Sequence, residues 1–236
     1  ATYQVADGAT AVLTAKLAGA ELQWTLDVDN RSSLDLVEVT CPSIRALRLG
    51  PSATDDFLVT PNWQGGIETT DPLHFGGGNV PYPTGGGMAW LDLYEKKPAH
   101  GVTLSSRDPS LMGCRIRADA DVDADGLLFG VTRYAHVRPG KRWSSPLSVL
   151  GMHGGDWHAA ADAYRAWARS WMRPPQPPEW VREADGWYGL VTSANGNRVP
   201  FRRIPDYLKQ MRELGTNYIQ VWGQMTGGNN CPPVDQ

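Results

Sequence analysis

Residues 115–125, RIRADADVDAD, alternate strictly between apolar and charged side chains. Because successive residues of a strand point to opposite faces, one face would carry the apolar set and the other face the charged set. The apolar set comprises Ile116, Ala118, Ala120, Val122 and Ala124. A period of two over this length predicts a half-buried strand of an antiparallel sheet.

Similar segments lie on both sides of this stretch. They are LQWTLDVDN (22–30), DLVEVTCPSI (35–44), GVTLSSRD (101–108) and LLFGVTRYAHVRPG (127–140). Many such segments without a helical pattern between them predict a mainly β fold, and we assign residues 1–152 to an antiparallel β-sandwich. Residues 61–87 are rich in glycine and proline, so we expect long surface loops there instead of regular structure.

A helical period replaces the alternation after Asp156. Apolar residues recur every three or four positions at Trp157, Ala160, Tyr164, Trp167 and Trp171. This spacing predicts an amphipathic helix with Asp156 as its N-cap. The prolines of RPPQPPEW (173–180) end the helix and favour an extended chain, so we predict a linker region over residues 153–182.

The pattern changes again from residue 183 to residue 236. GWYGLV (186–191) and NYIQVWG (217–223) are short apolar segments, and IPDYLKQMRELG (204–215) between them has a helical period that stops at Gly215. A strand, a helix and a strand within this length predict one βαβ unit. Its two strands would be parallel and its crossover right-handed.

The carboxyl ends of these two strands are the best candidate for a binding site, because ligands of parallel α/β folds bind at that edge. The loops TSANGN (192–197) and GQMTGGNN (223–230) leave the strands there. We predict substrate contacts from Trp187, Ser193, Asn195, Trp222, Gln224, Asn229 and Asn230. Amides, hydroxyls and indoles suit an uncharged polyol, although the same glycines and asparagines are also ordinary turn residues.

The sequence does not indicate other kinds of chemistry. A net charge of −3 without a basic stripe argues against nucleic acid, and no apolar run is long enough to span a membrane. DVDADG (121–126) begins like a calcium loop, but Thr132 stands where such a loop needs a bidentate acid. We expect no metal and no cofactor. We also expect Cys41, Cys114 and Cys231 to be isolated thiols without a disulfide.

Three stretches together resemble the α-galactosidase-like glycoside hydrolase superfamily. They are HVRPGKRWSSPLSVLGMHGGDWHAAADAYRAWARSWM (136–172), EADGWYGLVTS (183–193) and LGTNYIQVWGQMTGG (214–228). The closer match is a family of glycosidases known as domain of unknown function 6259. In such proteins a large sandwich similar to galactose mutarotase precedes a (β/α)8 barrel, and a helix with the GDWHxAADxYRxWA motif joins the two.

The resemblance implies that residues 183–236 are the first βαβ unit of a truncated (β/α)8 barrel. It also implies a retaining or inverting glycosidase with two carboxylates. In related enzymes these carboxylates lie on later barrel strands, so no residue of this chain is matched to a catalytic role. Relatives often carry aspartates after the second strand, where this sequence has Gly223 and Gln224.

We therefore expect the N-terminal portion of a bacterial glycoside hydrolase that acts on a polysaccharide or oligosaccharide, secreted or periplasmic. Its partners would be the glycan and the remainder of the barrel, and this portion alone would be inactive. Trp63, in the 61–87 segment, would border the cleft. The alternatives are a non-catalytic carbohydrate-binding sandwich and a purely structural domain that supports a barrel.

Overall fold

The computed structural model describes residues 1–5, 8–51, 55–62, 65–121, 123, 125–191, 193–194, 197–198 and 201–222. The chain divides into two compact units. The sandwich unit comprises Ala1–Arg173, and the C-terminal unit comprises Pro174–Gln236.

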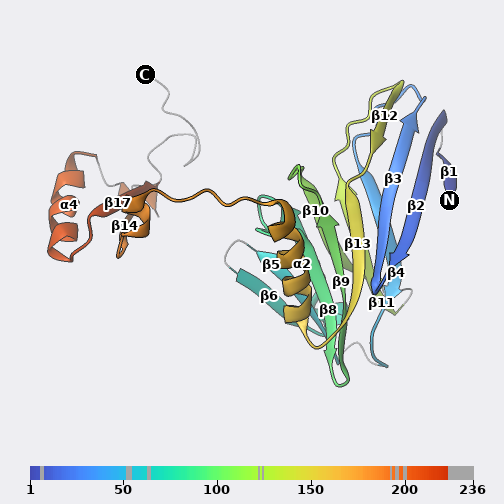
Figure 1. Cartoon of the computed structure of the whole chain (residues 1–236), viewed down its shortest axis with the longest axis horizontal. Helices are drawn as coiled ribbons and strands as arrows, with labels where there is room; N and C mark the ends of the chain where they lie inside the picture. The colour runs from blue at the N-terminus through green and yellow to red at the C-terminus, as the bar shows by residue number, and fades with distance from the viewer. Residues whose placement is uncertain are drawn as a thin grey trace. The chain divides into compact units, whose positions relative to one another are not determined.

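The first layer of the sandwich unit is a nine-stranded antiparallel sheet (Figure 1). Its strands, in spatial order, are β1 (Thr2–Val5), β2 (Ala9–Ala18), β3 (Glu21–Asn30), β13 (Leu147–Gly154), β9 (Ala99–Arg107), β8 (Trp90–Lys96), β5 (Asp56–Asn62) and β6 (Gly65–Thr70). The ninth strand, β12 (Lys141–Ser144), pairs with β3 beside β13.

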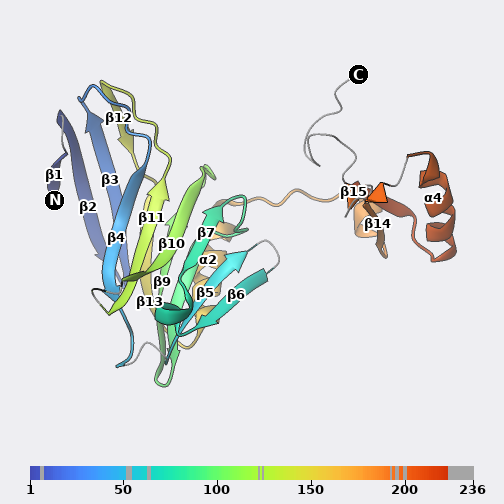
Figure 2. The ribbon, with the colours of Figure 1, turned by 180° about the vertical axis from the view of Figure 1, so that it is seen from behind.

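The second layer is a four-stranded antiparallel sheet, seen in front of the first in Figure 2. Its order is β4 (Val39–Leu47), β11 (Gly126–Arg133), β10 (Cys114–Asp121) and β7 (Gly78–Tyr82). A short helix, α1 (Pro72–Phe75), precedes β7. The predicted β-sandwich is therefore confirmed as two facing antiparallel sheets.

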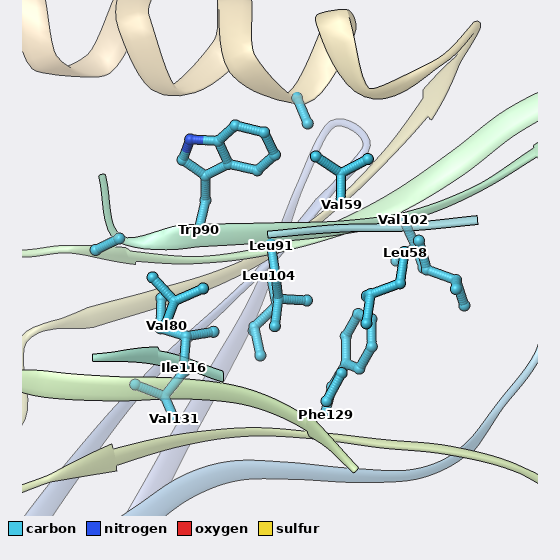
Figure 3. Close-up of a cluster of buried hydrophobic side chains, with 14 of the residues drawn as sticks. Leu58, Val59, Val80, Trp90, Leu91, Val102, Leu104, Ile116, Phe129 and Val131 are labelled. Atoms are coloured by element: carbon cyan, nitrogen blue, oxygen red, sulfur yellow. The ribbon is translucent and has the colours of Figure 1, made fainter. Parts of the chain in front are cut away.

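The core of the sandwich unit lies between these two sheets (Figure 3). Leu91 and Leu104 of the large sheet and Ile116 and Phe129 of the small sheet have no exposed surface. Trp90 and Val59 point away from this core toward a helix on the other side of the large sheet. The large sheet is therefore buried on both faces in this region, because a helix covers its outer side.

That helix is α2 (Trp157–Trp171), which contacts β8, β9 and β13. Asp156 caps it, with its Oδ1 accepting a hydrogen bond from the backbone N–H of His158 at 3.0 Å. Ala160 and Tyr164 of the predicted apolar face are buried. The Tyr164 hydroxyl accepts a hydrogen bond from the buried backbone N–H of Ala89 at 3.1 Å. The helix and its cap are as the sequence predicts.

The stretch 115–125 forms a shorter strand than its alternation predicts. β10 ends at Asp121, which is paired with Gly126 of β11 across a turn. Alternation holds through Ile116 and Ala118, which are buried, and fails at Ala120, which is exposed. Asp121 is buried instead, because Arg45 donates two hydrogen bonds to its carboxylate at 2.7 and 2.8 Å. Val122 and Ala124 lie outside the described residues.

The prediction of irregular loops over residues 61–87 is wrong. This segment contains the end of β5, all of β6, helix α1 and strand β7. Both β6 and β7 are terminal strands of their sheets. Terminal strands tolerate glycine and proline, because one side of the backbone needs no partner in the ladder. The glycine-rich composition therefore marks sheet edges in this protein.

The C-terminal unit contains two parallel strands joined through a helix. Its elements are α3 (Glu179–Arg182), β14 (Trp187–Val191), β15 (Ser193–Ala194), β16 (Asn197–Arg198), the 3₁₀ helix η4 (Phe201–Arg203), α4 (Ile204–Glu213) and β17 (Tyr218–Trp222). β14 and β17 pair in parallel from Trp187 opposite Tyr218 to Val191 opposite Trp222. Gly215 follows α4 with a φ of +78°. The predicted parallel βαβ unit is confirmed, and so is the end of its helix before Gly215.

None of the helices in the described ranges is long and apolar enough to cross a membrane.

Candidate functional site

The carboxyl ends of β14 and β17 lie at one edge of the C-terminal unit. The parallel register places Val191 and Trp222 opposite each other as the last residues of the two strands. The backbone of Ser193 follows in β15, which pairs with β16 as a short hairpin where a loop was expected. The backbone positions of Ser193 and Trp222 therefore lie at the predicted binding edge.

Trp187 lies at the opposite edge of the same pair of strands. It is the first residue of β14, four residues before Val191, which corresponds to about 13 Å along a strand. Its ring lies 5.5 Å from the ring of Tyr218, the first residue of β17, and 5.7 Å from that of Trp180 in α3. Trp187 thus belongs to an aromatic cluster at the amino ends of the strands, apart from Ser193 and Trp222.

The other predicted contact residues lie outside the described residues. They are Asn195, Gln224, Asn229, Asn230 and Trp63. Their assignment to a glycan site stays a prediction, as does the contact of Ser193 and Trp222 with a ligand. Among the described residues of the C-terminal unit there is no buried carboxylate.

The sandwich unit contains the buried ionisable groups that the sequence did not reveal. The most enclosed is Asp92 on the outer face of β8, which is fully buried. Its Oδ1 lies 2.8 Å from Nε2 of His153 on β13. His153 reaches it across Gly101, where a Cβ atom would lie 2.5 Å from the imidazole ring. The hydrogen bond with Asp92 raises the pKa of His153, and burial raises the pKa of the Asp92 carboxyl.

A pair of buried carboxylates lies where the start of β5 meets the end of β8. Asp56 and Glu95 are opposite each other in the register, and both are buried. Burial raises the pKa of Asp56, and the charge of Glu95 raises it further. A glycosidase pair would need an open site between its carboxyls. Asp56 instead accepts a backbone hydrogen bond from Leu49 at 3.4 Å, so this pair is closed off by its own loop.

Arg133 is buried between the two sheets with neutral hydrogen-bond partners. Its guanidinium donates to the carbonyl of Cys41 at 3.0 Å and to the hydroxyls of Ser148 and Ser106 at 2.9 and 3.2 Å. Burial lowers its pKa and raises the pKa of the Cys114 thiol. Cys41 and Cys114 are free thiols, and Cys231 lies outside the described residues. This network links Arg133 of the small sheet to Ser106 and Ser148 of the large sheet.

Metal ligands do not gather in the described ranges, where no three His, Cys, Asp or Glu side chains could hold an ion together. Within the DVDADG stretch, Asp121 pairs with Arg45 and Asp125 pairs with Arg48. Two of the aspartates in the stretch that resembles a calcium loop thus each form an ion pair with an arginine.

A hollow of about 420 Å³ lies where α2 meets the β6 edge of the large sheet. We call it the helix–edge pocket. Its lining residues are Val59, Pro61, Gly65, Gly66, Glu68, Met88, Trp90, Trp157 and Ala161. The floor is buried, since Val59 and Trp90 are 5% and 2% exposed, whereas Gly66 and Glu68 lie on the exposed strand β6. The pocket is therefore apolar below and polar at its rim.

No family model matches the chain, and no curated protein does either. Solved structures do match it. The α-N-acetylgalactosaminidase NagBb from Bifidobacterium bifidum, in its Gal-NHAc-DNJ complex, aligns over 98% of this chain and 44% of its own with a TM-score of 0.57 and 14% identity. Its GalNAc complex gives a TM-score of 0.55 over the same shares of the two chains, also at 14% identity.

The GH36 α-galactosidase AgaA from Geobacillus stearothermophilus is also similar, with a TM-score of 0.46 and 11% identity over 95% of this chain and 33% of its own. The chain spans less than half the length of the solved structures described above. At this identity the similarity to NagBb concerns the fold. The sandwich and the elements that follow it in this chain therefore have the fold of a part of a glycoside hydrolase.

Proposed function

We propose that this chain is the N-terminal portion of a glycoside hydrolase, in which a β-sandwich and a linker helix precede a (β/α)8 barrel. The observation that carries the proposal is the order of its elements. An antiparallel sandwich leads directly into the capped helix α2, then into a proline-rich stretch and a parallel β14–α4–β17 unit. The alignment with NagBb covers 98% of this chain, which supports the proposal that the whole chain corresponds to one portion of a glycoside hydrolase.

In this proposal β14 and β17 are the first two strands of the barrel, and their carboxyl ends form one wall of a glycan site. The backbone of Trp222, the last residue of β17, and that of Ser193, two residues after β14, lie at that edge. In this proposal the two catalytic carboxylates lie on later barrel strands, as the resemblance to glycoside hydrolases implies. We propose a neutral or weakly charged polysaccharide or oligosaccharide as the substrate. We also propose that the protein is bacterial, that it is secreted or periplasmic, and that its family is domain of unknown function 6259.

The decisive experiment is to read the encoding gene past the codon for Gln236 and to assay its full product. A barrel takes about 250 residues, so we expect an open reading frame of roughly 200 further codons. The full product should hydrolyse aryl α-galactosides or α-N-acetylgalactosaminides, whereas this chain alone should not. Replacing either of the carboxylates after the fourth and sixth barrel strands by its amide should lower the rate constant of glycoside hydrolysis by several orders of magnitude.

Two outcomes would contradict the proposal. One is a reading frame that stops at Gln236, which would leave no room for a barrel. The other is a full product with eight βα units that hydrolyses no glycoside in a broad panel of aryl substrates.

A further inference from the structure

The helix–edge pocket is built from three segments that are distant in the sequence. Trp157 and Ala161 of α2 form one wall, Trp90 of β8 and Val59 of β5 form the floor, and strand β6 forms the opposite rim. A volume of about 420 Å³ is within the range of small-molecule pockets. All residues that line the pocket belong to the sandwich unit.

The walls of the pocket are apolar and aromatic. Trp157 is only partly buried, and its indole stacks on the imidazole of the neighbouring His158 with a ring separation of 3.8 Å. This stack holds the indole in one orientation at the start of α2. An indole ring beside an apolar floor packs well against the C–H bonds on one face of a saturated ring. The aromatic wall is therefore ready to receive such a ring without rearrangement.

The rim supplies hydrogen-bonding groups. Glu68 lines the pocket with a side chain that is 40% exposed. β6 is the terminal strand of the large sheet and pairs with β5 on one side only. In an antiparallel ladder the backbone groups of every second residue point away from the partner strand, so in β6 these groups have no neighbouring strand. Gly65 and Gly66 add no side chain to cover these groups. A ligand in the pocket could therefore form hydrogen bonds along the side that β6 lines.

The charge at this rim is balanced. Glu68 accepts a hydrogen bond from the Tyr94 hydroxyl, and its other oxygen lies 3.6 Å from Nζ of Lys96. Lys96 in turn lies over the ring of Phe57, with its Nζ 3.7 Å from the ring centre. Because the Glu68 carboxylate is already paired with Lys96, a charged ligand of either sign would gain little electrostatic binding energy at this position. The balance favours an uncharged ligand with hydroxyl groups.

We propose that the helix–edge pocket is a non-catalytic binding site for a neutral sugar ring. The ring lies against Trp157 and the apolar floor, and its hydroxyls bond to Glu68 and to the edge backbone of β6. The site is independent of any barrel, and it stands whether or not the full protein hydrolyses glycosides.

The test is binding of neutral oligosaccharides to this whole chain. The probes are immobilised oligosaccharides with terminal galactose, N-acetylgalactosamine, glucose, mannose or xylose, followed by titration of the best one in solution. We expect binding by at least one of them, and at least tenfold weaker binding by Trp157→Ala. Protein NMR should show that the indole N–H signal of Trp157 shifts on addition of that sugar.

Two variants of one strand serve as a matched pair. A Cβ atom on Gly66 would make only ordinary contacts, 3.8 Å from the Thr60 carbonyl oxygen and 4.0 Å from Val59, so Gly66→Leu should fold and fill the pocket. Ile67 is exposed and does not line the pocket, so Ile67→Ala is the control. We expect Gly66→Leu to abolish binding and Ile67→Ala to keep it within twofold, with unchanged circular dichroism in both.

Several results would overturn the proposal. Unimpaired binding by Gly66→Leu would place the sugar elsewhere, and absence of binding to all five probes by the folded chain would remove the site. Equal or tighter binding of uronic-acid oligosaccharides would contradict the argument from balanced charge. None of these results depends on hydrolysis, so they leave the proposed function to its own experiment.

Discussion

The sandwich unit and the C-terminal unit differ in how much apolar surface each removes from water. The sandwich unit buries a large cluster of hydrophobic side chains between its two sheets and under α2, and a second, smaller cluster that contains Ala11, Leu26 and Val28. Among the described residues of the C-terminal unit, Leu190 and Met211 are the buried hydrophobic side chains, whereas Trp180 and Trp187 are each 48% exposed. Burial is the main source of folding free energy. The sandwich unit therefore has a core large enough to fold alone, whereas the described part of the C-terminal unit has secondary structure with few buried side chains.

Hydrogen exchange should show the largest difference between the units. We expect backbone amides of β8, β9, β10 and β11 to exchange at least about 10³-fold more slowly than those of β14 and β17, because only the former open with the whole sandwich. The measurement is amide exchange of the whole chain, followed by mass spectrometry of its peptides. Equal protection in β14 and β9 would mean that the two units share one cooperative core.

The same substitution in each unit provides a sharper comparison. Leu91 in β8 has no exposed surface, and Leu190 in β14 is 6% exposed. Leu91→Ala should lower the free energy of unfolding of the sandwich by about 2–5 kcal/mol, because it leaves a cavity in a packed core. Leu190→Ala should leave the main melting transition unchanged. Calorimetry of both variants checks this, and a comparable loss from the two would contradict the separation of the units.

The attachment of α2 to the sandwich is open to a smaller test. Tyr164→Phe removes the acceptor of the buried Ala89 N–H and should cost about 1–3 kcal/mol, the usual penalty for an unpaired buried donor. Tyr188→Phe in the C-terminal unit is the matched control and should cost nothing measurable. Chemical denaturation followed by circular dichroism distinguishes the two variants, and an unaffected Tyr164→Phe would show that water replaces the lost acceptor.

The smallest expected effect is a pH dependence confined to the sandwich unit. The hydrogen bond with Asp92 raises the pKa of His153 above its ordinary value of 6.5. The stability that protonated His153 contributes is therefore complete below about pH 6.5 and is lost as pH rises through the raised pKa. Asp92 has the largest effect on the pKa of this imidazole, burial acts against it, and the Gly154 carbonyl and Asp156 raise the pKa more weakly.

We therefore expect the melting temperature of the native chain to exceed that of His153→Gln by a few degrees at pH 6 and by less at pH 9. Scanning calorimetry at the two values measures the difference. A gap that widens toward pH 9 would reverse the assigned sign.

Local patterns predicted most of the fold, and failed where a distant residue decided the outcome. Ile116 and Ala118 follow the alternation of their strand, but Asp121 is buried because Arg45, 76 positions away, pairs with it. The face of α2 and the stop at Gly215 depend on residues within a few turns, and both were predictable. Contacts across the sheet were not, because a single sequence does not reveal which strands are neighbours.

The candidate site illustrates the same limit. The parallel pairing of β14 and β17 followed from the strand–helix–strand order. The position of Trp187 was also predictable from that order, since the residue begins the strand whereas the binding edge lies at the carboxyl end of the strand. By contrast, Asp92 and His153 are 61 positions apart, and the helix–edge pocket combines three segments. Neither arrangement leaves a local pattern in the sequence.

The place of β13 in the large sheet has a consequence for synthesis of the protein. β13 is the last strand of the sandwich in the chain, yet it lies between β3 and β9 in the middle of the sheet. While the ribosome still holds Leu147–Gly154, strands β1–β2–β3 and strands β9–β8–β5–β6 have no common partner. The large sheet therefore cannot be completed until this late segment leaves the ribosome, and α2, which contacts β13, β9 and β8, follows it directly in the chain.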